Sequence, residues 1–174
     1  MPAAVELKDL HKIIQGVMGW GNGHCHQFII HENYYGEVHE EFDNDWIDYR
    51  GIALDSLVTK EGETFEYDYD FGDGWDHRIE VEKITNAFME HELPICLKGK
   101  RNCPPENCGG PWRYKDLVEI TKNPQHKEYI ETMDWLGAID DDGEIEEDFL
   151  EPERFDLEET NEVLHSENYG CEIW

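Results

Sequence analysis

Cysteine and histidine, the residues that most often bind zinc, gather in two stretches of the chain. Three of the five cysteines lie in a proline- and glycine-rich loop over residues 91–114, and alternation along residues 24–30 places two histidines on one face of a predicted strand. The candidate ligands of a structural zinc are Cys96, Cys103, Cys108, His91, His24 and His26. These cysteines lack the paired spacing of zinc ribbons and fingers, so small buried thiols and core histidines are the alternative.

Carboxylates surround a Gly-Asp-Gly turn, where they could hold a hard cation or serve as a general acid and base. Asp70, Asp73 and Asp76 follow one another at intervals of three, and His77 comes next. The candidates for catalysis are Asp70, Asp73, His77 and, in the later loop, Glu106. Aspartates beside glycines also form turns, which is the alternative for this cluster. For His77, as for His24 and His26, the alternative is a core histidine paired with Tyr69 or a backbone carbonyl.

The chain is strongly acidic, with 42 Asp and Glu against 14 Lys and Arg and a formal net charge of −28. This charge argues against direct binding to nucleic acid or to an anionic membrane, because both require clustered basic residues. Basic residues gather once, beside the cysteine-rich loop, where an anionic ligand or an acidic partner could dock; pairing with the chain's own carboxylates is the alternative. With the tryptophans nearby, the candidate ligand-binding residues are Trp75, Lys98, Lys100, Arg101, Trp112 and Arg113.

Several elements must position these residues. Apolar residues at helical spacing predict a helix over residues 7–18, ended by the glycines of residues 19–23, and a strand follows over residues 24–30. Residues 31–64 are weakly periodic and are expected to be loop with one short helix near residues 52–58. Asn123 and Pro124 are expected to start a helix that Gly137 ends, and Asp156 to cap a last helix. A shorter helix is expected over residues 114–121.

Strict alternation on both sides of residues 72–74 predicts a β-hairpin. A three-residue loop would pair Phe71 with Trp75, and by the same register Tyr69 with His77 and Tyr67 with Ile79. This pairing places the apolar side chains of both strands on one face.

Five blocks of the chain resemble, in order, one known family. They are residues 9–20, 24–28, 67–77, 103–110 and 155–161. The family is named after the third open reading frame of a root-inducing plasmid, and its members are also labelled resolvase-like passengers of insertion elements. The resemblance implies a link to mobile elements but no known activity. Cutting and rejoining DNA is disfavoured, because the two serines lie beside acids and the five arginines are scattered.

Members of the family usually begin with two further strands before the first helix. We therefore expect an α+β fold with an antiparallel or mixed sheet, in which a central hairpin packs on the N-terminal helix and the C-terminal part is helical. It would resemble a ubiquitin-like grasp that lacks its first hairpin. We expect a single domain over residues 1–174 with an acidic helical segment over residues 140–174, located in the cytoplasm because no apolar run of about 18 residues and no signal-like start are present.

No nucleophile–base pair and no phosphate-binding glycine loop is recognisable, so a non-enzymatic binding module is the leading hypothesis. Its recognition surface would be the loops over residues 72–77 and 103–110, and its partner a protein or a small anionic ligand. A metal-dependent enzyme, with zinc as one possible cofactor, is the first alternative. An acidic mimic of DNA that occupies a DNA-binding protein is the second.

Overall fold

The computed structural model describes residues 1–38, 45–85, 93–146 and 149–171. The chain divides into two compact units. Unit 1 comprises Met1–Gly99 together with Asp156–Trp174, and unit 2 comprises Lys100–Phe155. The fold class is α+β, as predicted. None of the described helices is long and apolar enough to cross a membrane.

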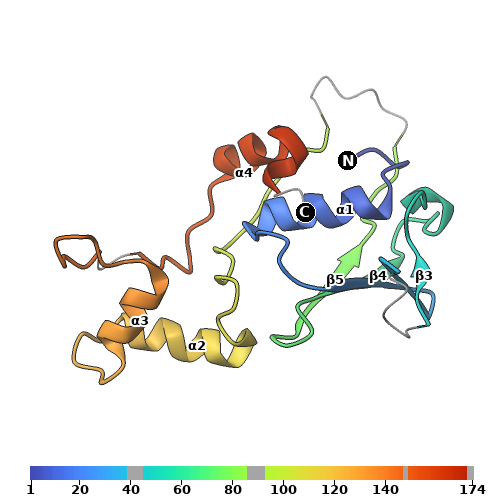
Figure 1. The fold of residues 1–174 in the computed structure, drawn as a ribbon. Coiled ribbons are helices and arrows are strands. Elements are labelled where there is room, and N and C mark those ends of the chain that lie inside the picture. Colours follow the sequence, from blue (N-terminus) through green and yellow to red (C-terminus); the bar gives the residue numbers. More distant parts are fainter. Residues whose placement is uncertain (39–44, 86–92, 147–148, 172–174) are drawn as a thin grey trace. The chain divides into compact units, whose positions relative to one another are not determined.

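Unit 1 is built on a five-stranded mixed sheet (Figure 1). The strands are β1 (His26–Ile30), β2 (Asn33–Gly36), β3 (Ile47–Asp48), β4 (Thr64–Tyr69) and β5 (Trp75–Glu80), in the order β3-β2-β1-β4-β5. The pair β2 and β3 is parallel and the other neighbours are antiparallel. Phe28 and Ile30 of β1 are buried, as the predicted alternation requires.

Helix α1 (Leu7–Met18) has the predicted bounds and ends at Gly19, whose φ of 69° is a left-handed conformation that glycine adopts without strain. Its buried face carries Leu7, Leu10 and Ile13 together with two polar side chains, His11 and Gln15. Burial of polar groups on a helix face requires hydrogen-bond partners. His11 and Gln15 therefore need partners, and they find one in Tyr67 of the sheet.

The hairpin of β4 and β5 forms, but the predicted register is wrong by two residues. Tyr69 pairs with Trp75 and Tyr67 with His77, so the loop runs from Asp70 to Gly74. The cause is Asp70, whose φ of 50° leaves the strand and whose carbonyl accepts from Gly74 N–H over 2.6 Å. A shift of two residues preserves side-chain parity, so the predicted faces are correct.

The region expected to be loop over residues 31–64 contains two strands, β2 and β3. Both are short, and β3 has two residues, which is too few for alternation to be recognised. The expected helix near residues 52–58 is a single 3₁₀ turn, η1 (Leu54–Ser56).

Unit 2 contains α2 (Gly110–Thr121) and α3 (Tyr129–Leu136). Its core is formed by Tyr129, Met133 and Ala138. Helix α2 starts before the predicted residue 114, with Pro111 in its first turn. The predicted start of α3 is wrong, because Asn123 closes a separate turn by accepting from His126 N–H. Gly137 ends α3 as predicted.

Helix α4 (Leu157–Leu164) and the 3₁₀ turn η2 (Glu167–Gly170) return the chain to unit 1, where α4 lies beside α1 (Figure 1). Asp156 caps α4 as predicted, accepting from Glu158 N–H and Glu159 N–H over 3.0 Å each. The helical part of the acidic C-terminal segment therefore begins at Leu157, whereas residues 140–155 belong to unit 2.

Candidate functional site

A closed ring of hydrogen bonds lies between α1 and the sheet of unit 1. Gln15 Nε2 donates to the Tyr67 hydroxyl over 3.0 Å, and this hydroxyl lies 2.8 Å from His11 Nδ1. His11 Nε2 lies 2.5 Å from Asn22 Oδ1, and the Asn22 backbone N–H donates to Gln15 Oε1 over 3.1 Å. Because an amide oxygen can only accept, His11 Nε2 carries the hydrogen and Nδ1 accepts from Tyr67. The ring holds His11 as this neutral tautomer.

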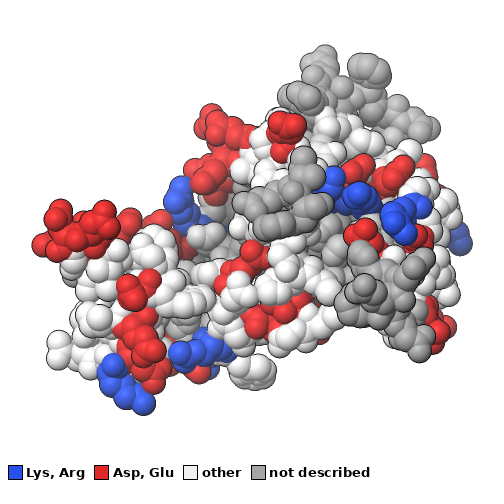
Figure 2. Space-filling model, viewed as in Figure 1, with Lys and Arg blue, Asp and Glu red and all other residues white. Residues whose placement is uncertain are grey.

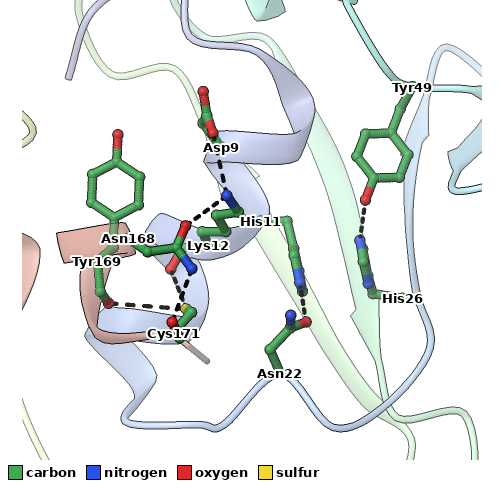
Figure 3. Close-up of polar contacts among 9 residues, drawn as sticks. All are labelled: Asp9, His11, Lys12, Asn22, His26, Tyr49, Asn168, Tyr169 and Cys171. Atoms are coloured by element: carbon green, nitrogen blue, oxygen red, sulfur yellow. Dashed lines mark hydrogen bonds and ion pairs between the residues drawn. The ribbon is translucent and has the colours of Figure 1, made fainter. Parts of the chain in front are cut away.

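A second histidine stacks on the first. The rings of His11 and His26 are parallel within 1° with centroids 3.4 Å apart, and His26 Nε2 lies 3.2 Å from the Tyr49 hydroxyl (Figure 3). Burial lowers the pKa of His11 from 6.5 to about 4 and lowers the pKa of His26 well below its usual value. Burial also raises the pKa of the Tyr49 and Tyr67 hydroxyls. The cluster is neutral and its hydrogen bonds are directional, which suits a specific core rather than proton transfer.

Aromatic rings continue the cluster toward the hairpin. Trp20 stacks on Tyr69 with centroids 4.9 Å apart and meets His77 edge-on at 5.6 Å. Trp20 also lies 5.8 Å from Trp75, centroid to centroid. His77 Nδ1 donates to the Tyr67 carbonyl over 3.1 Å. The predicted residues Trp75 and His77 therefore belong to one layer that closes the end of the core.

The predicted catalytic residues are divided between the two units. Asp70 Oδ1 accepts from Gly72 N–H at 3.0 Å and from Asp73 N–H at 3.2 Å, which is the turn-forming role named as the alternative. Asp70 Oδ2 also lies 3.5 Å from His24 Nε2. Glu106 belongs to unit 2, whereas Asp70, Asp73 and His77 belong to unit 1.

The candidate zinc ligands are likewise divided. His24, His26 and Cys96 lie in unit 1 and Cys103 and Cys108 in unit 2, while His91 falls outside the described residues. Within the described ranges, no group of three or more His, Cys, Asp or Glu is placed to hold a metal ion.

The thiol of Cys103 is also poorly suited to ionisation. Burial, with the neighbouring Cys108 and Glu106, raises the pKa of Cys103 to about 12. A thiol in this state is neutral near neutral pH and is a weak metal ligand and nucleophile.

Unit 2 contains a groove of about 640 Å³ between α2, α3 and the loop that precedes α2. It is lined by Asn107, Cys108, Arg113, Leu117, Glu128, Glu131, Thr132 and Trp135. Arg113 Nη2 lies 3.6 Å from Glu128 Oε2, and Trp135 keeps 48% of its surface exposed. Trp112, in the first turn of α2, is 85% exposed. The groove therefore combines two predicted site residues, Cys108 and Arg113, with an accessible aromatic ring.

The predicted basic residues are exposed, and both arginines have carboxylate partners. Arg101 Nε lies 3.3 Å from Glu153 Oε2, and Arg113 pairs with Glu128 as described. Lys98 belongs to unit 1 and Lys100 to unit 2. Figure 2 shows Lys and Arg in small separate groups among Asp and Glu. Both arginines therefore make the contact with the chain's own carboxylates that was named as the alternative from the sequence.

Comparison with known proteins places this geometry in a family. Residues 1–159 match the family described as plasmid pRiA4b ORF-3-like proteins. The chain belongs to this family. The sequence blocks that carried the resemblance supply His11, Gln15, His26 and Tyr67 to the cluster of unit 1, and Asn107 and Cys108 to the groove of unit 2.

Two relatives of this plasmid pRiA4b ORF-3-like chain carry names that assign no function. The uncharacterized protein y4hQ of Sinorhizobium fredii is 38% identical over 143 residues, covering 82% of this chain and 73% of that protein. The crystal structure of the protein of unknown function MM3350 from Methanosarcina mazei Go1 has a TM-score of 0.75 and 33% identity. This likeness covers 91% of this chain and 84% of that one.

Sequence reasoning missed the residues that organise the cluster. His11 and Gln15 lie on an otherwise apolar helix face, and Tyr49 lies in the region expected to be loop. One signal was available for His11 and Gln15: they are four residues apart and fall on the same face as Leu7 and Leu10, so two polar side chains had to be buried together. Their partners could not be inferred, because Tyr67 is 52 residues from Gln15.

Proposed function

We propose that the chain is a non-enzymatic binding module whose recognition site is the groove of unit 2. The observation that carries this proposal is the groove itself. Its volume lies in the range of about 300–1,000 Å³ that is usual for ligand sites, and it joins an exposed indole to a small number of polar groups.

The chemistry of the groove favours a short segment of a protein partner. Trp135 and the buried Leu117 offer an apolar surface to one inserted side chain, while Arg113, Glu128 and Asn107 can hydrogen-bond its backbone. Arg113 and Lys127 lie 3.6 Å and 3.2 Å from the carboxylate of Glu128, so the site has no large net charge of either sign. Indole and guanidinium groups are those most often found at the energetic centres of protein interfaces.

The proposal is tested by selecting peptides from a displayed library against the purified chain and measuring their affinity by fluorescence polarisation. We expect Trp135→Ala to weaken binding about tenfold or more, as the loss of an aromatic anchor does, and Arg113→Gln to weaken it as well. The matched controls are Ile130→Ala on α3 and Lys115→Gln on α2, both exposed and outside the groove lining. Failure to select a peptide, or equal binding by all four variants, would refute the proposal.

The other hypotheses from the sequence are not taken further. The carboxylate of Asp70 is occupied by its turn, which speaks against a role as general acid or base. Among the described residues, no contact favours the function of a DNA mimic or of a metal-dependent enzyme, and we propose neither. The expected location in the cytoplasm and the link to mobile elements remain predictions.

A further inference from the structure

Strand β5 is the last strand of the sheet in the described part of the chain, with β4 on one side. The core-facing residues of β4, Phe65, Tyr67 and Tyr69, are 4%, 0% and 1% exposed. The residues of β5 on the same face, Trp75 and Ile79 among them, are only half-buried. An added strand would complete their burial, and an edge strand presents the backbone groups to receive one.

The sequence of β5 is complementary to itself. In an antiparallel pair of two copies with His77 opposite His77, Asp76 faces Arg78 of the partner subunit and Arg78 faces Asp76 of the partner subunit. On the core-side face, Trp75 lies opposite Ile79 of the partner subunit. Opposite charges and aromatic–aliphatic pairs at facing positions both stabilise a sheet.

We propose that two copies of the chain associate through antiparallel pairing of β5, with His77 at the two-fold axis. The pairing joins the two five-stranded sheets into one continuous sheet and makes a closed, self-complementary contact. Within each chain Arg78 lies opposite Glu66 of β4 in the register of the sheet, so in the dimer its two neighbouring positions are one acidic residue of its own chain and one of the partner subunit.

Other registers of the same pair are worse. A shift by one residue changes the side-chain parity and places Trp75 opposite a charged residue of the partner's β5. A shift to the next register of the same parity places either Asp76 opposite itself or Arg78 opposite itself. In the proposed register Glu80 lies opposite Gly74 of the partner subunit, so no carboxylate of β5 faces another. Charge complementarity therefore selects one arrangement.

The net charge of −28 opposes association of two copies at long range. Salt screens exposed charges beyond about 8 Å at physiological ionic strength, whereas contacts within the strand pair are closer than this. Self-association should therefore be measured in moderate salt, where the repulsion between the two acidic chains is screened.

The test is sedimentation equilibrium of the full chain and two charge-exchange variants. We expect the wild type to be a dimer. Asp76→Arg and Arg78→Asp each place like charges at both facing positions, so each variant alone should dissociate about tenfold more readily or be monomeric. Mixing the two variants restores an opposite charge at both positions and should yield a heterodimer, and the double variant Asp76→Arg/Arg78→Asp should dimerise with itself.

Recovery on mixing separates loss of the contact from loss of folding, because a variant that had failed to fold would not recover. The control is Arg101→Asp in unit 2, which makes the same change in charge as Arg78→Asp but at an exposed position outside β5. It should leave the dimer unchanged. A monomeric wild type in moderate salt would overturn the proposal. This holds even if β5 were to bind a strand of a different protein. A dimer that neither single variant weakens would also overturn it. None of these outcomes depends on the groove of unit 2.

Discussion

His11 should make the protein less stable in mild acid. In the folded chain burial lowers its pKa from 6.5 to about 4, whereas in the unfolded chain it takes up a proton near the ordinary value. The unfolded state therefore binds more protons between these two pH values, and stability falls as the pH drops through that window. The full loss from this one group is about 3 kcal/mol. Urea unfolding at pH 6.5 and at about pH 5 measures the decline.

The variant His11→Gln identifies the group responsible. Glutamine keeps one donor and one acceptor for Asn22 and Tyr67 but does not titrate, so its stability should decline less over the same pH range. His26, whose pKa is lowered for the same reason, accounts for part of the remaining decline. An identical decline in the wild type and in His11→Gln would show that His11 is not neutral in the folded state.

Gly16 is required by a close approach. A Cβ at this position would lie 2.5 Å from the backbone oxygen of Tyr169, where η2 packs on α1. We expect Gly16→Ala to lower the free energy of unfolding by about 1–3 kcal/mol, because overpacking outweighs the gain of up to about 1 kcal/mol in helix propensity. Gly23→Ala is the control, since a Cβ at Gly23 would have no neighbouring atom within 4 Å. Equal stabilities in urea would mean that η2 does not rest on α1.

How far the site could be predicted depends on sequence separation. Alternation placed His26 and Phe28 on the correct face of a strand, because side-chain parity is a local property. The stack of His26 on His11 could not be predicted, since it requires α1 to cross the sheet at one position. Two residues of the groove were candidates from the sequence, Cys108 as a metal ligand and Arg113 as a ligand-binding residue, but the groove itself was not predicted. Glu128 and Trp135 lie at the start and in the last turn of α3, whose placement the sequence leaves open.

Among the elements, the hairpin loop depends on one aspartate. Asp70 has a positive φ and its carboxylate accepts from two backbone N–H groups. Asp70→Ala should cost about 2–4 kcal/mol, from two lost hydrogen bonds and a left-handed alanine. Asp70→Asn should retain most of the stability, because asparagine tolerates this conformation and keeps an accepting oxygen. Urea unfolding compares the two variants, and a similar loss in both would show that the charge, through His24, matters more than the turn.

The same hairpin shows why element types were easier to predict than their ends. Apolar alternation identified both strands and their buried faces, but the loop length depends on where Asp70 leaves the strand. The start of α3 was missed for a related reason: Asn123 and Pro124 have the composition of a helix start, yet they form a turn of their own before Tyr129. Capping residues specify a local hydrogen bond, and the same bond serves turns and helices.

At the scale of the whole molecule, the negative charge is unevenly distributed along the chain. Residues 140–167 carry 14 acidic residues and one basic residue, Arg154. In the structure this stretch crosses from unit 2 to unit 1 at Asp156. The first junction between the units, at Lys100, lies inside the proline- and glycine-rich loop over residues 91–114.

This excess of negative charge should make stability depend on salt. Carboxylates that repel one another are held closer together in the folded state, so screening favours folding. We expect the urea midpoint to rise between about 20 mM and about 300 mM NaCl, where the Debye length falls several-fold. Neutralising two exposed acids of unit 2, by Asp141→Asn and Glu144→Gln, should raise stability by a few tenths of a kcal/mol at low salt and by less at high salt. The opposite trend, a midpoint that falls with NaCl, would mean that attractive pairs such as Arg113 with Glu128 contribute more than the net repulsion.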